Sequence, residues 1–393
     1  MQMARSGWIV PLIIGLCMLI GLTSVAVAAP SNDVMQQNSQ SVDMTQVETY
    51  WNKLIKEYGG FFPDNKPPTF SQMLMTGAKS FSLTGMLHAM LKYLFHEILT
   101  NGKLLATIII LTVFSMILET LHSSFERNTI SKVGYSITYL VLIVLAINSF
   151  YIAIDYAKSA ISRMIEFMFA VVPILLTLLA SSGSLATVAV LHPLIVFVVN
   201  AVGTAVYFFV FPLLFFSTIL NIVSFLSEKY KVTHLANLLR TISLSLLGFF
   251  VTVFLGVISV QGATGAVADG VTLKTAKFIA GSFVPVVGRM FSDATDTVMT
   301  ASLLMKNAIG LAGVAIILLL CAFPAIKILT LALIYKVSAA VMQPLGDSPI
   351  IACLQMIGKS MIYVFAALSV VSLMFFLAIT IIITAGNVTV MVR

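Results

Sequence analysis

Long apolar stretches dominate the chain after Lys103, and their lengths predict a bundle of membrane-spanning helices. A helix needs about 20 apolar residues to cross the roughly 30 Å hydrocarbon layer, where its backbone groups must pair internally. Eight stretches are expected, with a tight hairpin near Gly203 dividing the fourth from the fifth. Their approximate bounds are 103–120, 133–154, 164–181, 185–203, 205–226, 239–260, 308–334 and 360–385. The pattern therefore predicts an all-α, polytopic integral membrane protein.

The first 28 residues have the layout of a cleaved secretory signal peptide. Arg5 precedes an apolar run from Trp8 to Val25, and the small residues Ala26 and Ala28 suit signal peptidase. The alternative is an uncleaved first transmembrane helix, because the apolar run is nearly long enough to span. In both interpretations the positive residue stays inside, so the following segment lies outside the cytoplasm.

Segment 29–99 is polar and is expected to be extracytoplasmic, partly disordered and partly amphipathic helix. One helical pattern ends at Gly59-Gly60, and a second runs from Met73 to Leu99. The apolar positions of the first are Val47, Tyr50, Trp51, Leu54, Ile55 and Tyr58. The sequence leaves open whether the second helix lies on the bilayer surface, docks on a partner protein or packs on the membrane core of the chain itself.

Composition excludes the soluble classes. Hydrophobic residues make up 59% of the chain and charged residues 9%, against roughly 45–50% and 25% in soluble domains. The net charge of +7 comes from scattered residues, which disfavours nucleic-acid binding. Cys17, Cys321 and Cys353 lie in apolar stretches without metal-ligand or disulfide spacing, so neither a metal nor a disulfide framework is expected.

Two short sequences resemble catalytic motifs and lack a required residue. Gly358-Lys359-Ser360 would end a phosphate-binding loop, but position 353 is cysteine where that loop needs glycine. His96-Glu97 lacks the second histidine of a zinc-hydrolase motif, because position 100 is threonine. We therefore expect no enzyme activity and no cofactor.

Several polar side chains fall within the predicted spans, where each must find a partner or face water. Helix–helix hydrogen bonding explains the asparagines, and snorkelling or an interhelical pair explains the glutamate and the lysine. The histidine fits a hydrogen bond within the bundle or a proton relay. These residues are Asn148, Glu166, His192, Asn200, Asn221 and Lys327.

Residues 261–307 are richer in small residues and are expected to form a loop or re-entrant segment between two membrane helix groups, 100–260 and 308–393. If 286–304 is helical, the spacing puts Arg289, Asp293 and Asp296 on one charged stripe. This ridge is a candidate pore lining or docking surface, with a solvated loop as the alternative. The residues expected to shape the backbone before it are Gly281, Pro285 and Gly288.

The stretch GSFVPVVGRMFSDATDTV, residues 281–298, resembles the stage III sporulation protein AE family of endospore-forming bacteria. The resemblance extends to the layout of signal sequence, polar segment and multispan region. It implies a subunit in the mother-cell membrane around the forespore, within a channel-like or secretion-like complex. The implied partners are other stage III sporulation membrane and ring proteins, a secretion-type ATPase and, indirectly, a forespore protein, with a homo-oligomer also possible. It assigns no role to the Arg/Asp ridge.

Two other functions remain open from the sequence. A self-contained secondary transporter or permease would use Glu166, His192 and Lys327 in a site at the middle of the membrane. A purely structural anchor would hold ring proteins without a conduction path.

Overall fold

The structure is a computed structural model of the chain, and it describes residues 44–62, 68–72, 83–124, 129–226, 231–283, 287–345 and 348–391. Between residues 261 and 298, side chains are described only for Asp269 and Thr275. The predicted signal peptide, with Ala26 and Ala28, lies outside the described residues.

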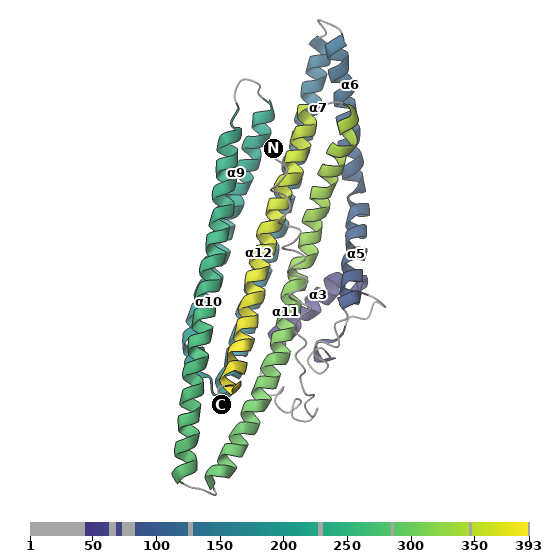
Figure 1. The fold of residues 1–393 in the computed structure, drawn as a ribbon. Coiled ribbons are helices and arrows are strands. Elements are labelled where there is room, and N and C mark those ends of the chain that lie inside the picture. Colours follow the sequence, from purple (N-terminus) through teal and green to yellow (C-terminus); the bar gives the residue numbers. More distant parts are fainter. Residues whose placement is uncertain are drawn as a thin grey trace.

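The described residues form an elongated bundle of α-helices (Figure 1). Helices α3 (Thr45–Tyr58) and α5 (Leu83–Thr100) lie on the side of this bundle, and the remaining helices run along its length. The helices are α3 (Thr45–Tyr58), α5 (Leu83–Thr100), α6 (Gly102–Ser124), α7 (Thr129–Ser181), α8 (Leu185–Ala205), α9 (Phe211–Leu226), α10 (Thr233–Phe283), α11 (Val287–Met342) and α12 (Pro349–Met391). Short helical segments are η1 (Gly59–Phe61), η4 (Val206–Val210) and η5 (Gln343–Leu345).

Five of the described helices are long and apolar enough to cross a membrane, so the eight predicted spans are not confirmed. The number rises to six if the bent pair Thr84–Thr100 and Gly102–Leu118, which meet at 46°, is one span. The five are Ser136–Ser181, Leu185–Phe225, Thr233–Val260, Met299–Met342 and Pro349–Ala385. Several predicted spans are therefore parts of longer helices.

Helix α7 joins the spans predicted at 133–154 and 164–181. It is 53 residues long, which corresponds to roughly 80 Å, and it continues through Pro173. Asp155 and Arg163, which lie between the two predicted spans, and Glu166, near the start of the second, are all exposed on the surface of one continuous helix. Polar residues on one helical face do not interrupt the backbone hydrogen bonds.

The predicted hairpin near Gly203 is wrong, because α8 continues through η4 into α9. Gly203 instead lies against α7, where a side chain at this position would meet Ile165. The π-helical segment Val206–Val210 ends two residues before Pro212. A wider turn fits there because proline has no amide donor and its ring crowds the carbonyl one turn back.

Residues 261–307, expected as a loop or re-entrant segment, are helical over 261–283 and 287–307. Helices α10 and α11 both extend beyond the end of the bundle where the C-terminus lies (Figure 1). Gly281 is in α10, Gly288 is in α11, and Pro285 falls outside the described residues. The scattered glycines do not interrupt these helices, because each glycine lowers helix stability by only about 1 kcal/mol relative to alanine.

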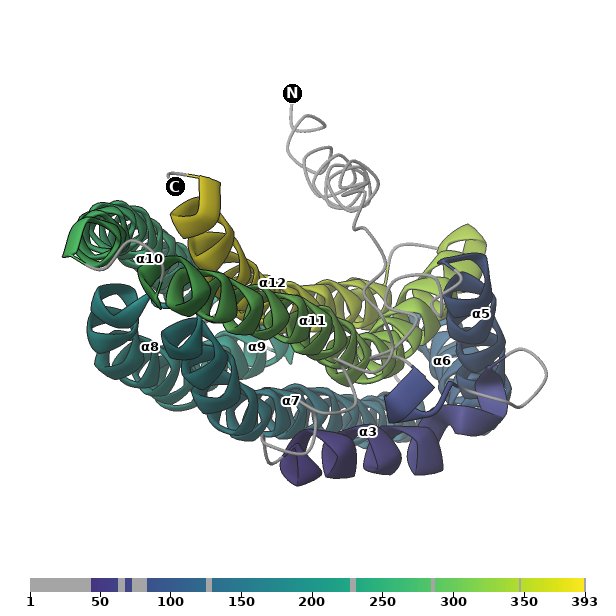
Figure 2. The same ribbon diagram turned by 90° about the horizontal axis from the view of Figure 1, so that it is seen from below.

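The centre of the bundle is formed by α7, α11 and α12, with α8, α9 and α10 along one side (Figure 2). Helix α12 packs closely on α11 at Gly358, where an added Cβ would lie 2.9 Å from Lys336 Cγ and 3.1 Å from the carbonyl oxygen of Ala332. The small residue lets the two backbones approach, as is common between membrane helices.

We predict that Gly358→Ala destabilises the bundle whereas Gly256→Ala does not. A Cβ at Gly358 would lie 2.9 Å from Lys336 Cγ and 3.1 Å from the Ala332 carbonyl oxygen, and the resulting overpacking costs about 1–3 kcal/mol. A Cβ at Gly256 has nothing within 4 Å, so alanine there gains up to about 1 kcal/mol of helix propensity. Thermal unfolding of both variants in the same detergent measures the difference, and equal midpoints would contradict the packing described.

Candidate functional site

Helix α3 lies across the outer side of α7 (Figure 2). Val47, Trp51, Leu54 and Tyr58 are buried, while Asn52, Lys53 and Lys56 on the other face are exposed. Tyr50 makes an edge-to-face contact with Phe167 of α7 at 5.5 Å between ring centroids. The predicted amphipathic helix therefore packs on the membrane core of its own chain.

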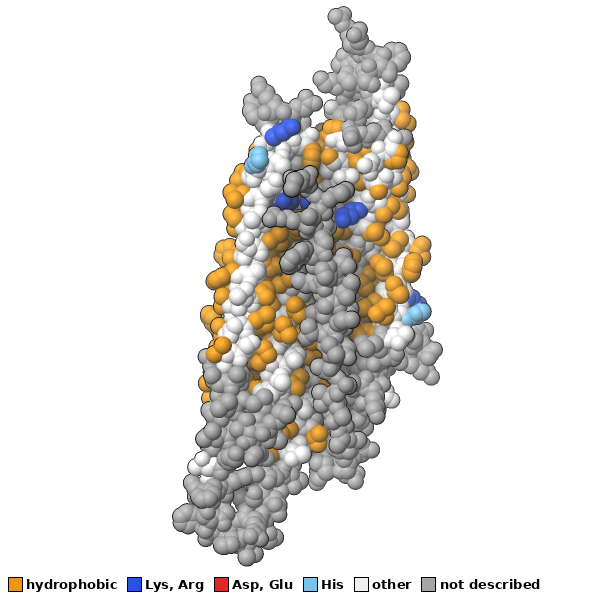
Figure 3. Space-filling view, in the orientation of Figure 1, with side chains coloured by type: hydrophobic (Ala, Val, Ile, Leu, Met, Phe, Trp, Pro, Cys, Tyr) orange, Lys and Arg blue, Asp and Glu red, His pale blue; other side chains and the backbone are white. Residues whose placement is uncertain are grey.

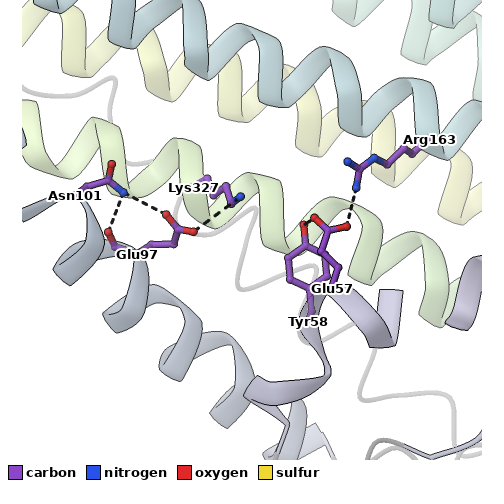
Figure 4. Close-up of polar contacts among 6 residues, drawn as sticks. All are labelled: Glu57, Tyr58, Glu97, Asn101, Arg163 and Lys327. Atoms are coloured by element: carbon purple, nitrogen blue, oxygen red, sulfur yellow. Dashed lines mark hydrogen bonds and ion pairs between the residues drawn. The ribbon is translucent and has the colours of Figure 1, made fainter. Parts of the chain in front are cut away.

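Glu57 connects the end of α3 to α7 (Figure 4). Its Oε2 accepts a hydrogen bond from Arg163 Nη1 at 3.1 Å, and its Oε1 accepts one from the Tyr58 hydroxyl at 2.6 Å. The side chains of Arg163 and Glu57 are about half exposed, so the pair gives less than about 1 kcal/mol of stability. Its main effect is to fix where α3 ends on α7.

An aromatic cluster joins α3, α5 and α11. The Tyr58 ring stacks on Phe323 of α11 at 3.8 Å, and Tyr93 of α5 contacts the edges of both rings. Aromatic pairs of this kind add about 0.5–1.5 kcal/mol each beyond the area they bury. Burial raises the pKa of Tyr58, and the adjacent Glu57 carboxylate raises it further.

Helix α5 carries a second ion pair to the bundle. Glu97 Oε1 lies 4.0 Å from Lys327 Nζ of α11, and Asn101 donates to the Glu97 carboxylate at 3.2 Å (Figure 4). Lys327 also lies over the ring of Tyr156 in α7, 4.9 Å from its centroid. One lysine thus connects α5, α11 and α7. We call the residues Glu57, Tyr58, Tyr93, Glu97, Arg163, Phe323 and Lys327 the N-terminal latch.

The other polar residues singled out in the spans lie apart from the latch. Asn221 is buried, donates to the Ser217 carbonyl oxygen at 3.0 Å, and leaves its Oδ1 without a partner among the described residues. The remaining four are exposed on the helices that carry them: Asn148, Glu166, His192 and Asn200. No contact described between them forms a shared site.

Arg289, Asp293 and Asp296 all belong to α11, so the helical condition for the charged ridge holds along the backbone. Their side chains are outside the described set. The pore or docking role of the ridge therefore remains a prediction.

Sequence reasoning missed two buried charges. Lys306 of α11 is 0% exposed, and its Nζ donates to the Ile383 carbonyl oxygen of α12 at 2.8 Å. Asp269 of α10 is 2% exposed and accepts from the backbone amides of Ala186 and Thr187 at 2.8 and 2.9 Å, which caps α8. Lys306 lies two residues before the span predicted at 308–334, and Asp269 lies nine residues after the span predicted at 239–260. Only the antiparallel packing reveals their partners.

The contacts described for the latch hold helices together. Among the described residues, no group of three or more His, Cys, Asp or Glu side chains could hold a metal ion. The described carboxylates of Glu57, Glu97 and Asp269 each have an interhelical partner. The chemistry visible in the latch is ion pairing and aromatic packing.

We predict that Trp51→Ala releases α3 from the bundle. Trp51 is 1% exposed and its Nε1 donates to the Pro68 carbonyl oxygen at 3.0 Å, so truncation costs about 3–5 kcal/mol. Hydrogen–deuterium exchange should rise across residues 45–58. Asn52→Ala, on the exposed face of the same helix, is the matched control and should leave exchange unchanged. Unchanged protection in Trp51→Ala would contradict the docking of α3.

We predict that docking of α3 weakens above about pH 10. The pKa of Tyr58 is raised in the folded state, so the neutral phenol contributes stability that is fully present below the unfolded value of 10.0. That stability is lost as the pH rises through the folded value. The emission wavelength of Trp51, in a Trp8→Phe background, reports the release, and Tyr58→Phe should flatten the pH dependence. The same alkaline transition in Tyr58→Phe would exclude this phenol as its cause.

Comparisons with known proteins agree on one family. The family described as stage III sporulation protein AE matches residues 66–386, which include the latch residues of α5, α7 and α11. The chain is 53% identical over 366 residues to the stage III sporulation protein AE of Bacillus subtilis (strain 168), covering 93% of this chain and 92% of that protein. No solved structure matches this chain. The chain therefore belongs to the stage III sporulation protein AE family.

Proposed function

We propose that this protein is a non-enzymatic, multi-pass membrane subunit of a channel-like or secretion-like complex that links mother cell and forespore during sporulation. The observation that carries the proposal is the 53% identity with a stage III sporulation protein over almost the whole chain. Identity at this level over 93% of the residues supports a shared role in sporulation, in which the protein is needed for forespore development.

The long-helix bundle supports a subunit that organises an assembly. Helices of 51 and 56 residues, α10 and α11, are roughly 75–85 Å long and exceed the roughly 30 Å hydrocarbon layer. Part of each helix must then extend into an aqueous layer or lie strongly tilted. Extension beyond the bundle gives α10 and α11 surface for contact with other components.

The proposed location is the mother-cell membrane around the forespore, with α3 and α5 on the extracytoplasmic side. The proposed partners are other stage III sporulation membrane and ring proteins, a secretion-type ATPase and, through them, a forespore protein. Because Gly358-Lys359-Ser360 lacks the glycine that a phosphate-binding loop requires at position 353, we place ATP use in a partner and not in this chain.

The transporter alternative required Glu166, His192 and Lys327 to share a site. They lie on α7, α8 and α11, and Lys327 is engaged by Glu97 and Tyr156. Solute uptake by the purified protein alone in vesicles, lost on Glu166→Gln, would favour the transporter over the proposal.

We predict that charge reversal along the ridge reduces complex formation. Arg289→Glu, Asp293→Lys and Asp296→Lys, tested together by tagged purification from sporulating cells, should recover about tenfold less of the co-purifying proteins, equivalent to about 1.4 kcal/mol. Lys336→Glu, an exposed charge in the same helix, is the matched control. Intact assembly with altered permeation would assign the ridge to a pore lining, and normal sporulation would remove both roles.

A further inference from the structure

We propose that three lysine or arginine residues paired with tyrosines form a belt around the bundle that marks one surface of the bilayer, and that Lys158 and Arg240 of this belt bind anionic phospholipid headgroups. The pairs are Lys158–Tyr207, Arg240–Tyr363 and Lys327–Tyr156. The charged groups lie 4.2, 5.1 and 4.9 Å from the ring centroids, respectively. The belt is defined by these six residues.

Each pair has the chemistry of a membrane interface. A tyrosine ring packs among apolar chains while its hydroxyl stays hydrated, and a long cationic side chain reaches the headgroups from an apolar stem. Tyrosine and basic residues are accordingly enriched where spans leave the hydrocarbon. Five of the six residues are half-buried, and Tyr207 is 44% exposed, so the pairs lie at the protein surface.

The pairs lie at one height on different sides of the bundle. Lys327 contacts Tyr156, and Lys158 is two residues further along α7. Lys158 reaches Tyr207 in η4, and Ser243 of α10 donates to the carbonyl oxygen of Val210, three residues beyond Tyr207. Arg240 is three residues before Ser243 and contacts α12 through Tyr363. The contacts thus run around the bundle within about one or two helical turns, or 5–11 Å.

On the side of the belt toward the C-terminus, α8, α10, α11 and α12 carry no charged residue for about one bilayer thickness, and the exposed Arg163 and Glu166 of α7 lie within about 12 Å of Lys158 along the helix. Lys306 and Lys327 bound an uncharged stretch of α11 about 20 residues long, roughly 30 Å. In α10 the stretch between Arg240 and Asp269 is also uncharged, and α7 has no charge after Glu166. The exposed side chains in this zone include the apolar Phe197 of α8 and Val253 of α10, together with the polar His192 and Asn200 of α8.

Asp269 and Lys306 mark the second surface of this layer. Asp269 caps α8 directly after the turn at Gly183, where the chain reverses with φ 87°. Lys306 bonds to α12 near its C-terminal end. Beyond this level α10 and α11 continue, as their extension in Figure 1 shows. The bilayer therefore covers the zone between the belt and the level of Asp269 and Lys306.

With the bilayer in this position, the N-terminal latch lies at the level of the belt, and part of the bundle lies outside the hydrocarbon layer. Arg163 is five residues from Lys158, so α3 lies near the headgroups. The hairpin of α6 and the first half of α7 lies on the far side of the belt, with Phe114 and Val144 exposed at 52% and 64%. On the front face, hydrophobic side chains cover most of the coloured surface, with few Lys or Arg residues between them (Figure 3).

Spin labels at four exposed sites test the depth of each zone. In full-length protein with Cys17→Ala, Cys321→Ala and Cys353→Ala, single labels at Phe197→Cys, Val253→Cys, Leu238→Cys and Val144→Cys are compared in phosphatidylglycerol-containing vesicles. Oxygen collision should be highest at 197 and 253, intermediate at 238 beside the belt, and lowest at 144. Oxygen collision at 144 equal to or above that at 253 would overturn the proposed bilayer position.

Headgroup recognition is tested separately with spin-labelled lipids. Association of labelled phosphatidylglycerol relative to phosphatidylcholine should fall in Lys158→Gln/Arg240→Gln, by about fivefold per cation, equivalent to about 1 kcal/mol each. The control Lys336→Gln/Lys359→Gln removes two exposed lysines with no described tyrosine partner. An equal fall in the control, or none in the belt variant, would overturn headgroup binding by the belt. Neither assay requires the sporulation complex, so either result is independent of the proposed function.

Discussion

Backbone amides in hydrocarbon have no water to bind, and this constraint explains why the helices run without interruption through sequence that suggests breaks. Helix α7 continues through Pro173 and past Asp155, Arg163 and Glu166, and α11 continues through Pro324. A break in either helix would expose unpaired amide and carbonyl groups, each costing several kcal/mol. A proline removes one donor, and a polar side chain removes none, so continuity is the less costly solution.

The composition and apolar stretches predicted the helical class and the location in a membrane, and the α3 pattern predicted both its helix and its end at Gly59. The number of spans was not predictable in the same way, because hydropathy measures length without revealing whether two adjacent stretches share one axis. Gly203 illustrates the difficulty: glycine is compatible with a turn and with close helix packing, and only the nearby Ile165 of α7 distinguishes them.

The polar contacts were also only partly predictable: the sequence shows which residues need a partner, but not which distant group supplies it. Lys327 was recognisable as costly in a span, and an interhelical pair was one expected solution, but its partner Glu97 lies in a segment predicted to be extracytoplasmic. Asp269 and Lys306 gave no signal, because their partners are backbone groups of α8 and α12. A backbone amide or carbonyl has no sequence identity, so such pairs emerge only from the fold.

The latch and the belt follow from one physical requirement. The charges of a long membrane helix are least costly where hydrocarbon ends, so Lys158, Arg240 and Lys327 gather at one height. An amphipathic segment that carries Glu57 and Glu97 finds complementary charge at that height and apolar helix surface beside it. Lys327 of the belt thereby also sets where α5 attaches, and Arg163, five residues from Lys158, sets where α3 attaches, which couples the position of the N-terminal helices to the bilayer surface.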